Sequence, residues 1–191
     1  DEVARGALST LLIAASSFII GLVLGQLGAA AKLYGGPASR FIANIYTTVI
    51  RAVPELVLIL LLFFAGTKGI SALGVAVGYG PVDINGTFAA ILVLGFVQGA
   101  YATEVIRGAI QAVPVGQIEA ARAFGMSGTQ VFTRVILPAM LPNAIPGLAN
   151  LWLVVIKDTA LITVTGASAE LAQMTKNAAG FTKSYFLFYF V

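Results

Sequence analysis

Three stretches of this chain, residues 6–31, 84–103 and 135–156, carry no charged side chain at all. A helix needs about 20 mostly apolar residues to cross the hydrocarbon layer of a membrane, which is about 30 Å thick. Each stretch is long enough to do so by itself. The stretches are also continuously apolar, whereas the strands of a membrane barrel are about 10 residues of alternating polarity. The sequence therefore predicts membrane-spanning helices.

The composition agrees and narrows the classes of function. Only 10% of the 191 residues are charged and 59% are hydrophobic, whereas a soluble domain has about 25% charged residues. This composition excludes a water-soluble globule and a disordered chain. The chain also has no Cys and no His, which removes disulfides, thiolate metal sites and the commonest general base. An integral membrane protein is indicated, and a self-contained enzyme is disfavoured.

We predict a single domain over residues 1–191, all-α and polytopic, with about five transmembrane helices. No internal repeat or linker divides it. Charges interrupt the second predicted span, and only the beginning of the fifth is expected to be present, because the chain ends eight residues into it. The predicted spans cover approximately residues 6–31, 41–65, 84–108, 133–156 and 184–191 onward.

Two of these spans carry small residues at helical spacing. Ser17, Gly21, Gly25 and Ala29 lie four residues apart in the first span, and the third span repeats the device from Gly95 through Gly99 to Thr103. Such spacing gives a flat helix face that lets a neighbouring helix approach closely. We expect both faces to serve helix packing.

The loop between the third and fourth spans predicts a short helix of its own, over about residues 117–125. Pro114 lacks an N–H and should end the preceding helix, and Gly125 is the usual kind of C-terminal stop. Glu119 is placed in the first turn, where the helix dipole favours an anion, and Ser127 could cap the helix that follows. A thin helix between two spans has the shape to insert into a groove on a partner.

The same segment resembles a known motif. Glu119-Ala120-Ala121, then Gly125, then Val135-x-Leu137-Pro138 is similar to the EAA motif of ABC importer permeases, with Val135 in place of the usual Ile. In that family the EAA loop is a cytoplasmic coupling helix that docks into the ATP-binding subunit. The resemblance assigns coupling to Gly116, Gln117, Glu119, Ala120, Ala121, Gly125, Leu137 and Pro138.

Other segments are similar to the polar amino-acid uptake subfamily. They are Glu104-Val-Ile-Arg107-Gly108-Ala109-Ile110, Val113-Pro114-x-Gly116-Gln117 and Lys157-Asp158-Thr159. The segment from Ile50 to Val57 most resembles basic amino-acid and opine members. The resemblance implies import of a polar, basic amino acid or opine.

The resemblance also implies the assembly. It predicts two copies of an ATP-binding cassette subunit, a second permease that is a paralogue, and an extracytoplasmic substrate-binding protein. It places the chain in the bacterial inner membrane, among membrane lipid, with its N-terminus outside and the EAA loop in the cytoplasm. The chain itself has no G-x-x-x-x-G-K-[ST] phosphate loop, so ATP and Mg²⁺ are expected in the partner ATPase. We expect no cofactor, catalytic residue, metal or nucleic-acid partner here.

Charged and polar side chains inside the spans are candidates for the substrate path, because they are costly in a membrane. Counted from Phe41, Arg51 lies about 15 Å along the second span, close to the middle of the bilayer. Glu55 is expected on the same helix face, and Pro54 should bend or open the helix between them. The alternative is that Arg51 and Glu55 merely neutralise each other. The full set of candidates is Arg51, Glu55, Gln98, Tyr101, Lys157, Asp158 and Thr159.

Glu104 and Arg107 lie three residues apart near the end of the third span, and we interpret them as a structural pair or a gate contact. An ion-coupled secondary amino-acid transporter is the alternative function. It predicts inverted repeats and a midplane acid. Glu55 could be that acid, but no repeat is visible.

Overall fold

The computed structural model describes residues 2–78, 80 and 85–162, and this part of the chain is helical without any strand. The helices are α1 (Glu2–Tyr34), α2 (Pro37–Ala52), α3 (Glu55–Ala76), α4 (Gly86–Gln111), α5 (Val115–Ala123), α6 (Gly128–Val131) and α7 (Leu137–Ile162), with a π-helical segment η1 (Phe132–Ile136) joining the last two. The predicted all-α fold is confirmed.

Four helical segments are long and apolar enough to cross a membrane: Ala4–Tyr34, Glu55–Ala76, Gly86–Gln111 and Gly128–Ala160. The surfaces of these helices expose large apolar side chains such as Leu12, Ile19 and Leu61, as expected of helices that face lipid rather than water. The predicted fifth span, at residues 184–191, lies outside the described residues.

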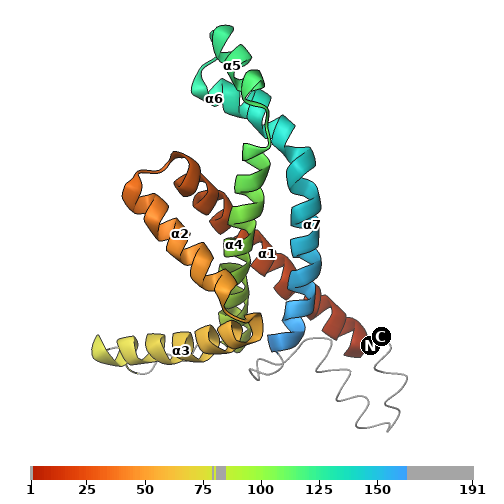
Figure 1. Ribbon diagram of the computed structural model, residues 1–191. Coiled ribbons are helices and arrows are strands. Elements are labelled where there is room, and N and C mark those ends of the chain that lie inside the picture. The colour runs from red at the N-terminus through yellow and green to blue at the C-terminus, as the bar shows by residue number, and fades with distance from the viewer. Residues whose placement is uncertain (1, 79, 81–84, 163–191) are drawn as a thin grey trace.

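The centre of the fold is the crossing of α1 and α4 (Figure 1). An added Cβ at Gly25 of α1 would lie 2.6 Å from the Cβ of Ala102, and one at Gly99 of α4 would lie 2.7 Å from the Cβ of Leu24. Only glycine lets the two backbones come this close. The predicted packing role of both small-residue faces is confirmed, and the two faces prove to be partners of each other.

The second predicted span is not one helix, which corrects the expectation for residues 41–65. The chain leaves α2 at Val53, whose backbone is extended (φ −98°, ψ 140°), and enters α3 after Pro54. The residue before a proline is driven out of the helical region by the proline ring, and the proline itself cannot donate a helical hydrogen bond. In Figure 1, α3 consequently runs sideways at the end of α4 where α2 terminates.

The fourth predicted span begins earlier than expected, because α6, η1 and α7 are continuous from Gly128 to Ile162. Within η1 the N–H of Leu137 bonds the carbonyl of Phe132, five residues back. Pro138 follows immediately and cannot donate to a carbonyl in the preceding turn. A π-helical turn is a common way of absorbing such a local mismatch.

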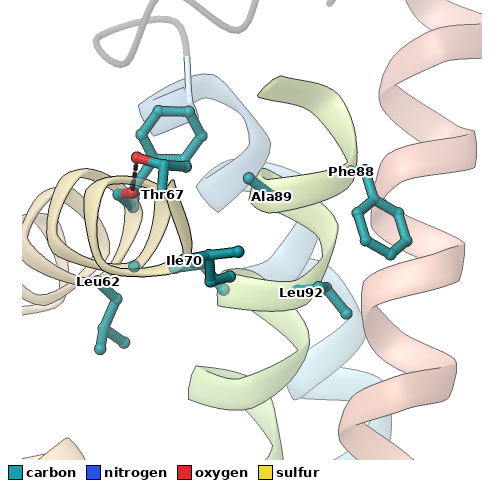
Figure 2. Close-up of a pocket in the computed structure, with 9 residues that line it drawn as sticks. Leu62, Thr67, Ile70, Phe88, Ala89 and Leu92 are labelled. Atoms are coloured by element: carbon teal, nitrogen blue, oxygen red, sulfur yellow. Dashed lines mark hydrogen bonds between the residues drawn. The ribbon is translucent and has the colours of Figure 1, made fainter. Parts of the chain in front are cut away.

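An apolar cavity of about 320 Å³ lies between α3 and α4 (Figure 2). Its side walls include Leu62, Ile70, Phe88 and Leu92. The hydroxyl of Thr67 is the polar side-chain group in this lining, and it already donates to the carbonyl of Phe63 at 2.7 Å. The lining of this cavity therefore has no free side-chain donor for a polar substrate.

Candidate functional site

The short helix predicted between the third and fourth spans exists, with shifted bounds. Pro114 occupies the N-cap position, and α5 then runs over Val115–Ala123 instead of 117–125. Glu119 therefore lies beyond the first turn, which contains no acidic residue. This corrects the expectation that the helix dipole stabilises Glu119, since that effect fades within the first turn.

The end of α5 is set by Gly125, as the sequence predicts. Gly125 has φ +77°, a conformation that side chains with a Cβ adopt only with strain. Its N–H bonds the carbonyl of Arg122 at 2.9 Å, and the N–H of Met126 bonds that of Ala121 at 3.2 Å. These two bonds form a Schellman motif, which satisfies carbonyls that the helix end leaves free.

Ser127 also caps the following helix, as expected. The Ser127 hydroxyl accepts from the N–H of Gln130, and the Gln130 side chain accepts from the N–H of Ser127. The Schellman motif at the end of α5 and the capping box at the start of α6 thus form a tight turn between these helices, at one end of the molecule (Figure 1).

The surface of α5 is open. Ala121 is buried in a hydrophobic cluster that includes Val131 and Ile136, which anchors α5 to the segment leading into α7. All the other residues that the resemblance assigns to coupling are exposed: Gly116, Gln117, Glu119, Ala120, Gly125, Leu137 and Pro138. Phe124, at the end of α5, is 86% exposed. Val115, at the start of α5, is also exposed, at 66%.

A second group of predicted residues meets inside the helical bundle. The side-chain amide of Gln98 on α4 donates to the carboxylate of Asp158 on α7, with 3.1 Å between Nε2 and Oδ2. Gln98 is 1% exposed and Asp158 is 6% exposed. The carboxyl group of Glu55, at the start of α3, lies close enough to that of Asp158 to interact with it. Three helices therefore bring three acceptor-bearing side chains to one place.

Two oxygens of this group are buried without a donor. Within the described part of the chain, Oε1 of Glu55 and Oε1 of Gln98 have no hydrogen-bond partner. An unpaired polar atom costs free energy when it is buried. Two such atoms beside a second carboxylate form a set of acceptors that suits a positively charged donor. We refer to Glu55, Gln98 and Asp158 as the acceptor cluster.

Arg51 and Tyr101 border the acceptor cluster. Tyr101 packs against a buried cluster that includes Ile50, the neighbour of Arg51, and Leu58 of α3. Arg51 is the penultimate residue of α2, and its side chain is exposed. Within the described part of the chain, Arg51 and Glu55 do not form an ion pair. The expectation that Arg51 and Glu55 share one helix face is wrong, because the break at Pro54 separates them.

Lys157 and Thr159, the neighbours of Asp158, do not join the acceptor cluster in the same way. Lys157 is exposed. Thr159 is 1% exposed and its hydroxyl donates to the carbonyl of Ile156 in its own helix, at 2.6 Å. Their assignment to the substrate path stays a prediction.

Glu104 and Arg107 form the predicted pair, and the structure adds a third member that the sequence did not reveal. Arg107 donates to Oε2 of Glu104 through Nε (3.0 Å) and Nη2 (2.8 Å). The ammonium of Lys32, on α1, binds Oε1 of Glu104 and the hydroxyl of Thr47 on α2. This network ties α1, α2 and α4 together. One sequence feature could have indicated that Lys32 contacts other helices. Lys32 lies one turn before the Gly35-Gly36-Pro37 break and is therefore still inside the first helix.

Comparison with known proteins gives the family. Residues 17–186 match the family described as binding-protein-dependent transport system inner membrane component. The chain is 43% identical to the histidine/lysine/arginine/ornithine transport system permease protein HisQ of Escherichia coli, covering 96% of this chain and 80% of HisQ. It is also 43% identical to the nopaline transport system permease protein NocQ of Agrobacterium fabrum, over 99% of this chain and 80% of that one.

Solved structures agree with the sequence relatives. The chain superposes on a chain of an amino acid ABC transporter, crystallised with histidines, with a TM-score of 0.81, 31% identity and coverage of 99% and 83% of the two chains. An inward-facing methionine transporter shares the fold alone, with a TM-score of 0.70 at 20% identity. The chain thus belongs to the family of inner-membrane permease components of binding-protein-dependent ABC transport systems.

Proposed function

We propose that this chain is the membrane-spanning subunit of an ATP-driven importer that carries a basic amino acid or an opine. The observation that supports this best is the acceptor cluster. Two carboxylates and an amide oxygen converge from α3, α4 and α7, and two of the buried oxygens lack a donor in the described residues.

The chemistry of a basic amino acid complements that cluster. An ammonium or guanidinium group carries several N–H donors and a positive charge, and hydrogen bonds between charged groups are roughly twice as strong as neutral ones. A neutral side chain would bring no positive charge to the two neighbouring carboxyl groups. The names of the relatives support the same class, since they specify histidine, lysine, arginine and ornithine, nopaline, and octopine.

The exposed α5 is proposed as the contact for the ATP-binding subunit. Its Schellman end and its buried Ala121 give it a fixed position, while Phe124 and Glu119 stay free for the partner. The importer would contain two ATP-binding subunits, which hold ATP and Mg²⁺, a second permease that is a paralogue, and an extracytoplasmic binding protein. This arrangement places α5 in the cytoplasm and the N-terminus outside, and the coupling residues Gly116, Gln117, Glu119, Ala120, Gly125, Leu137 and Pro138 at or beside that contact.

The test is uptake by proteoliposomes that contain the complete transporter, with competing arginine and glutamine. Glu55→Gln keeps the shape of the side chain and removes its charge. Losing one charge-assisted hydrogen bond costs about 1.5–3 kcal/mol, so the preference for arginine should fall about 10- to 150-fold. The matched control is Glu119→Gln, the same exchange in α5, which should slow both substrates by one common factor.

Two results would contradict the proposal. Unchanged discrimination between arginine and glutamine in Glu55→Gln would refute the basic specificity. Full transport by Gly125→Asp, a variant that cannot keep the Schellman end without strain, would refute the coupling role of α5.

A further inference from the structure

The second helix, α2, has three distinct faces. One face is buried and holds Ala43, Thr47 and Ile50. A second face is exposed and apolar, with Ile42, Ile45 and Val49 between 48% and 66% exposed. The third face is polar and exposed, and its residues recur at helical spacing: Arg40, Asn44, Thr48 and Arg51. A helix surrounded only by lipid has no use for such a polar face, because intramembrane polar groups face protein or a water-filled cavity.

Polar side chains of α4 and α1 lie opposite this face. Glu104, Arg107 and Gln111 recur three and four residues apart on α4, and the Nη1 of Arg107 donates to Gln111 at 2.8 Å. Lys32 of α1 connects the two helices through Glu104 and Thr47. The polar faces of α2 and α4 thus turn toward a common space.

Two cavities lie in that space, and a third lies beside them at the start of α2. The first, of about 370 Å³, is lined by Lys32, Thr47, Thr48, Arg51, Ala52 and Glu104. The second, of about 260 Å³, shares Lys32 with it and adds Arg40, Asn44, Arg107 and Gln111. The third, of about 380 Å³, shares Arg40 and Asn44 with the second. The shared residues make these cavities one groove, which we call the α2–α4 groove.

The α2–α4 groove starts at Arg51, beside the acceptor cluster, and ends at Arg40 and Gln111. Gln111 is the last residue of α4, three residues before α5 begins its approach at Pro114. In Figure 1 this direction leads from the α2–α3 break toward the end of the molecule that carries α5. The groove therefore runs from the neighbourhood of the acceptor cluster toward the end of the molecule that carries α5.

The lining of the groove is strongly basic. Among its described residues it contains Arg40, Arg51, Arg107 and Lys32, against the single carboxylate of Glu104. Glu104 is already bound on both oxygens, by Lys32 and Arg107. Arg51 and Arg40 make no ion pair within the part of the chain that the structure describes. The groove consequently has a positive potential, with cations available for a carboxylate.

We propose that the α2–α4 groove is a water-filled release path, which the transported amino acid enters carboxylate first from the acceptor cluster. The assignment of a substrate to this path rests on the proposed function. The inference that the groove is water-filled and positively charged does not depend on it. The carboxylate passes from Arg51 to Arg40 along the polar face of α2. The cationic end of a basic amino acid leaves the acceptor cluster last.

The chain has no cysteine, so single cysteines can report on the groove in the complete transporter. Asn44→Cys and Thr48→Cys should react with water-soluble, membrane-impermeant thiosulfonate reagents. Ile42→Cys and Ile45→Cys, on the apolar face of the same helix, are the matched controls and should react at least tenfold more slowly. Each reagent's labelling rate is divided by its rate with a small free thiol. On that scale the anionic reagent should react faster than the cationic one at Asn44→Cys and Thr48→Cys.

Substrate protection during ATP-driven turnover completes the test. Arginine at saturating concentration should slow the labelling of Thr48→Cys severalfold. Labelling of Asn44→Cys and Thr48→Cys no faster than of the controls would overturn the proposal and would indicate that lipid or a partner subunit covers this face. Labelling without protection by any amino acid would also overturn it. Protection by glutamine but not by arginine would support the groove and refute the basic specificity instead.

Discussion

The close approach of α1 and α4 predicts that one methyl group at Gly25 destabilises the protein. In Gly25→Ala the new Cβ would lie 2.6 Å from the Cβ of Ala102 and 3.0 Å from its carbonyl carbon. Carbon atoms prefer a separation of about 3.5–4.0 Å, so the two helices must part by about 1 Å. Overpacking of this kind costs about 1–3 kcal/mol.

The expected result is a lower thermal midpoint. For a chain of this size 1 kcal/mol corresponds to about 2–4 °C, so a loss of about 2 kcal/mol lowers the midpoint by about 4–8 °C. The measurement is the fraction of the purified transporter that stays monodisperse in size-exclusion chromatography after heating. Gly108→Ala is the matched control, because a Cβ there meets no atom within 4 Å and a helical Gly→Ala exchange is otherwise favourable.

A double variant separates contact from helix propensity. Ala102→Gly removes the colliding Cβ, so Gly25→Ala combined with Ala102→Gly should recover part of the loss. Recovery should be incomplete, because the backbone of Ala102 remains 3.0 Å from the new methyl. A Gly25→Ala variant as stable as Gly108→Ala would show that α1 and α4 do not approach this closely.

Three further outcomes are expected. Gly125→Ala should destabilise the end of α5 by about 1 kcal/mol, because φ +77° disfavours a Cβ; faster hydrogen exchange in α5 would reveal it. Glu104→Gln should lower the thermal midpoint, since the Lys32 side chain is only 9% exposed and would lose its carboxylate; Lys32→Met in the same background should restore part of the loss. Ser127→Ala should cost about 1 kcal/mol through loss of the N-cap, visible as easier proteolysis beside Gln130, and an unchanged cleavage rate would contradict the capping geometry.

Local features of the fold were predictable from the sequence because they depend on neighbours along the chain. Small residues four apart predicted the face that packs, and Gly125 and Ser127 predicted where α5 ends and α6 begins. Each rests on backbone sterics or on a bond spanning a few residues. Charge-free stretches likewise predicted the apolar helices.

The break at Pro54 was only partly predictable. Proline foretells a disturbed helix, but a kink and a complete interruption use the same residue. The outcome depends on what α3 packs against after the turn, including the contact of Ile59 and Phe63 with Leu94. For this reason the predicted span over residues 41–65, expected to bend or open at Pro54, is divided into α2 and α3. The expected shared face of Arg51 and Glu55 is therefore wrong.

The partners of the polar side chains were not predictable. Gln98 and Asp158 were each recognisable as polar groups within apolar segments, but they are 60 residues apart. Lys32 and Glu104 are 72 residues apart. A pairing over that distance depends on the relative depth and rotation of two helices, and a hydropathy pattern fixes each only to about one turn.

The close packing of α1 against α4 at their glycines also limits how the two helices can slide along each other. Ala102 sits in the notch that Gly25 leaves, and Leu24 sits in the notch at Gly99. To slide along α4, α1 would have to lift every such side chain out of its notch. The next notch is four residues away, about 6 Å at 1.5 Å per residue. A force along α4 should therefore move α1 with it, while the break at Pro54 leaves α2 and α3 as two separate helices.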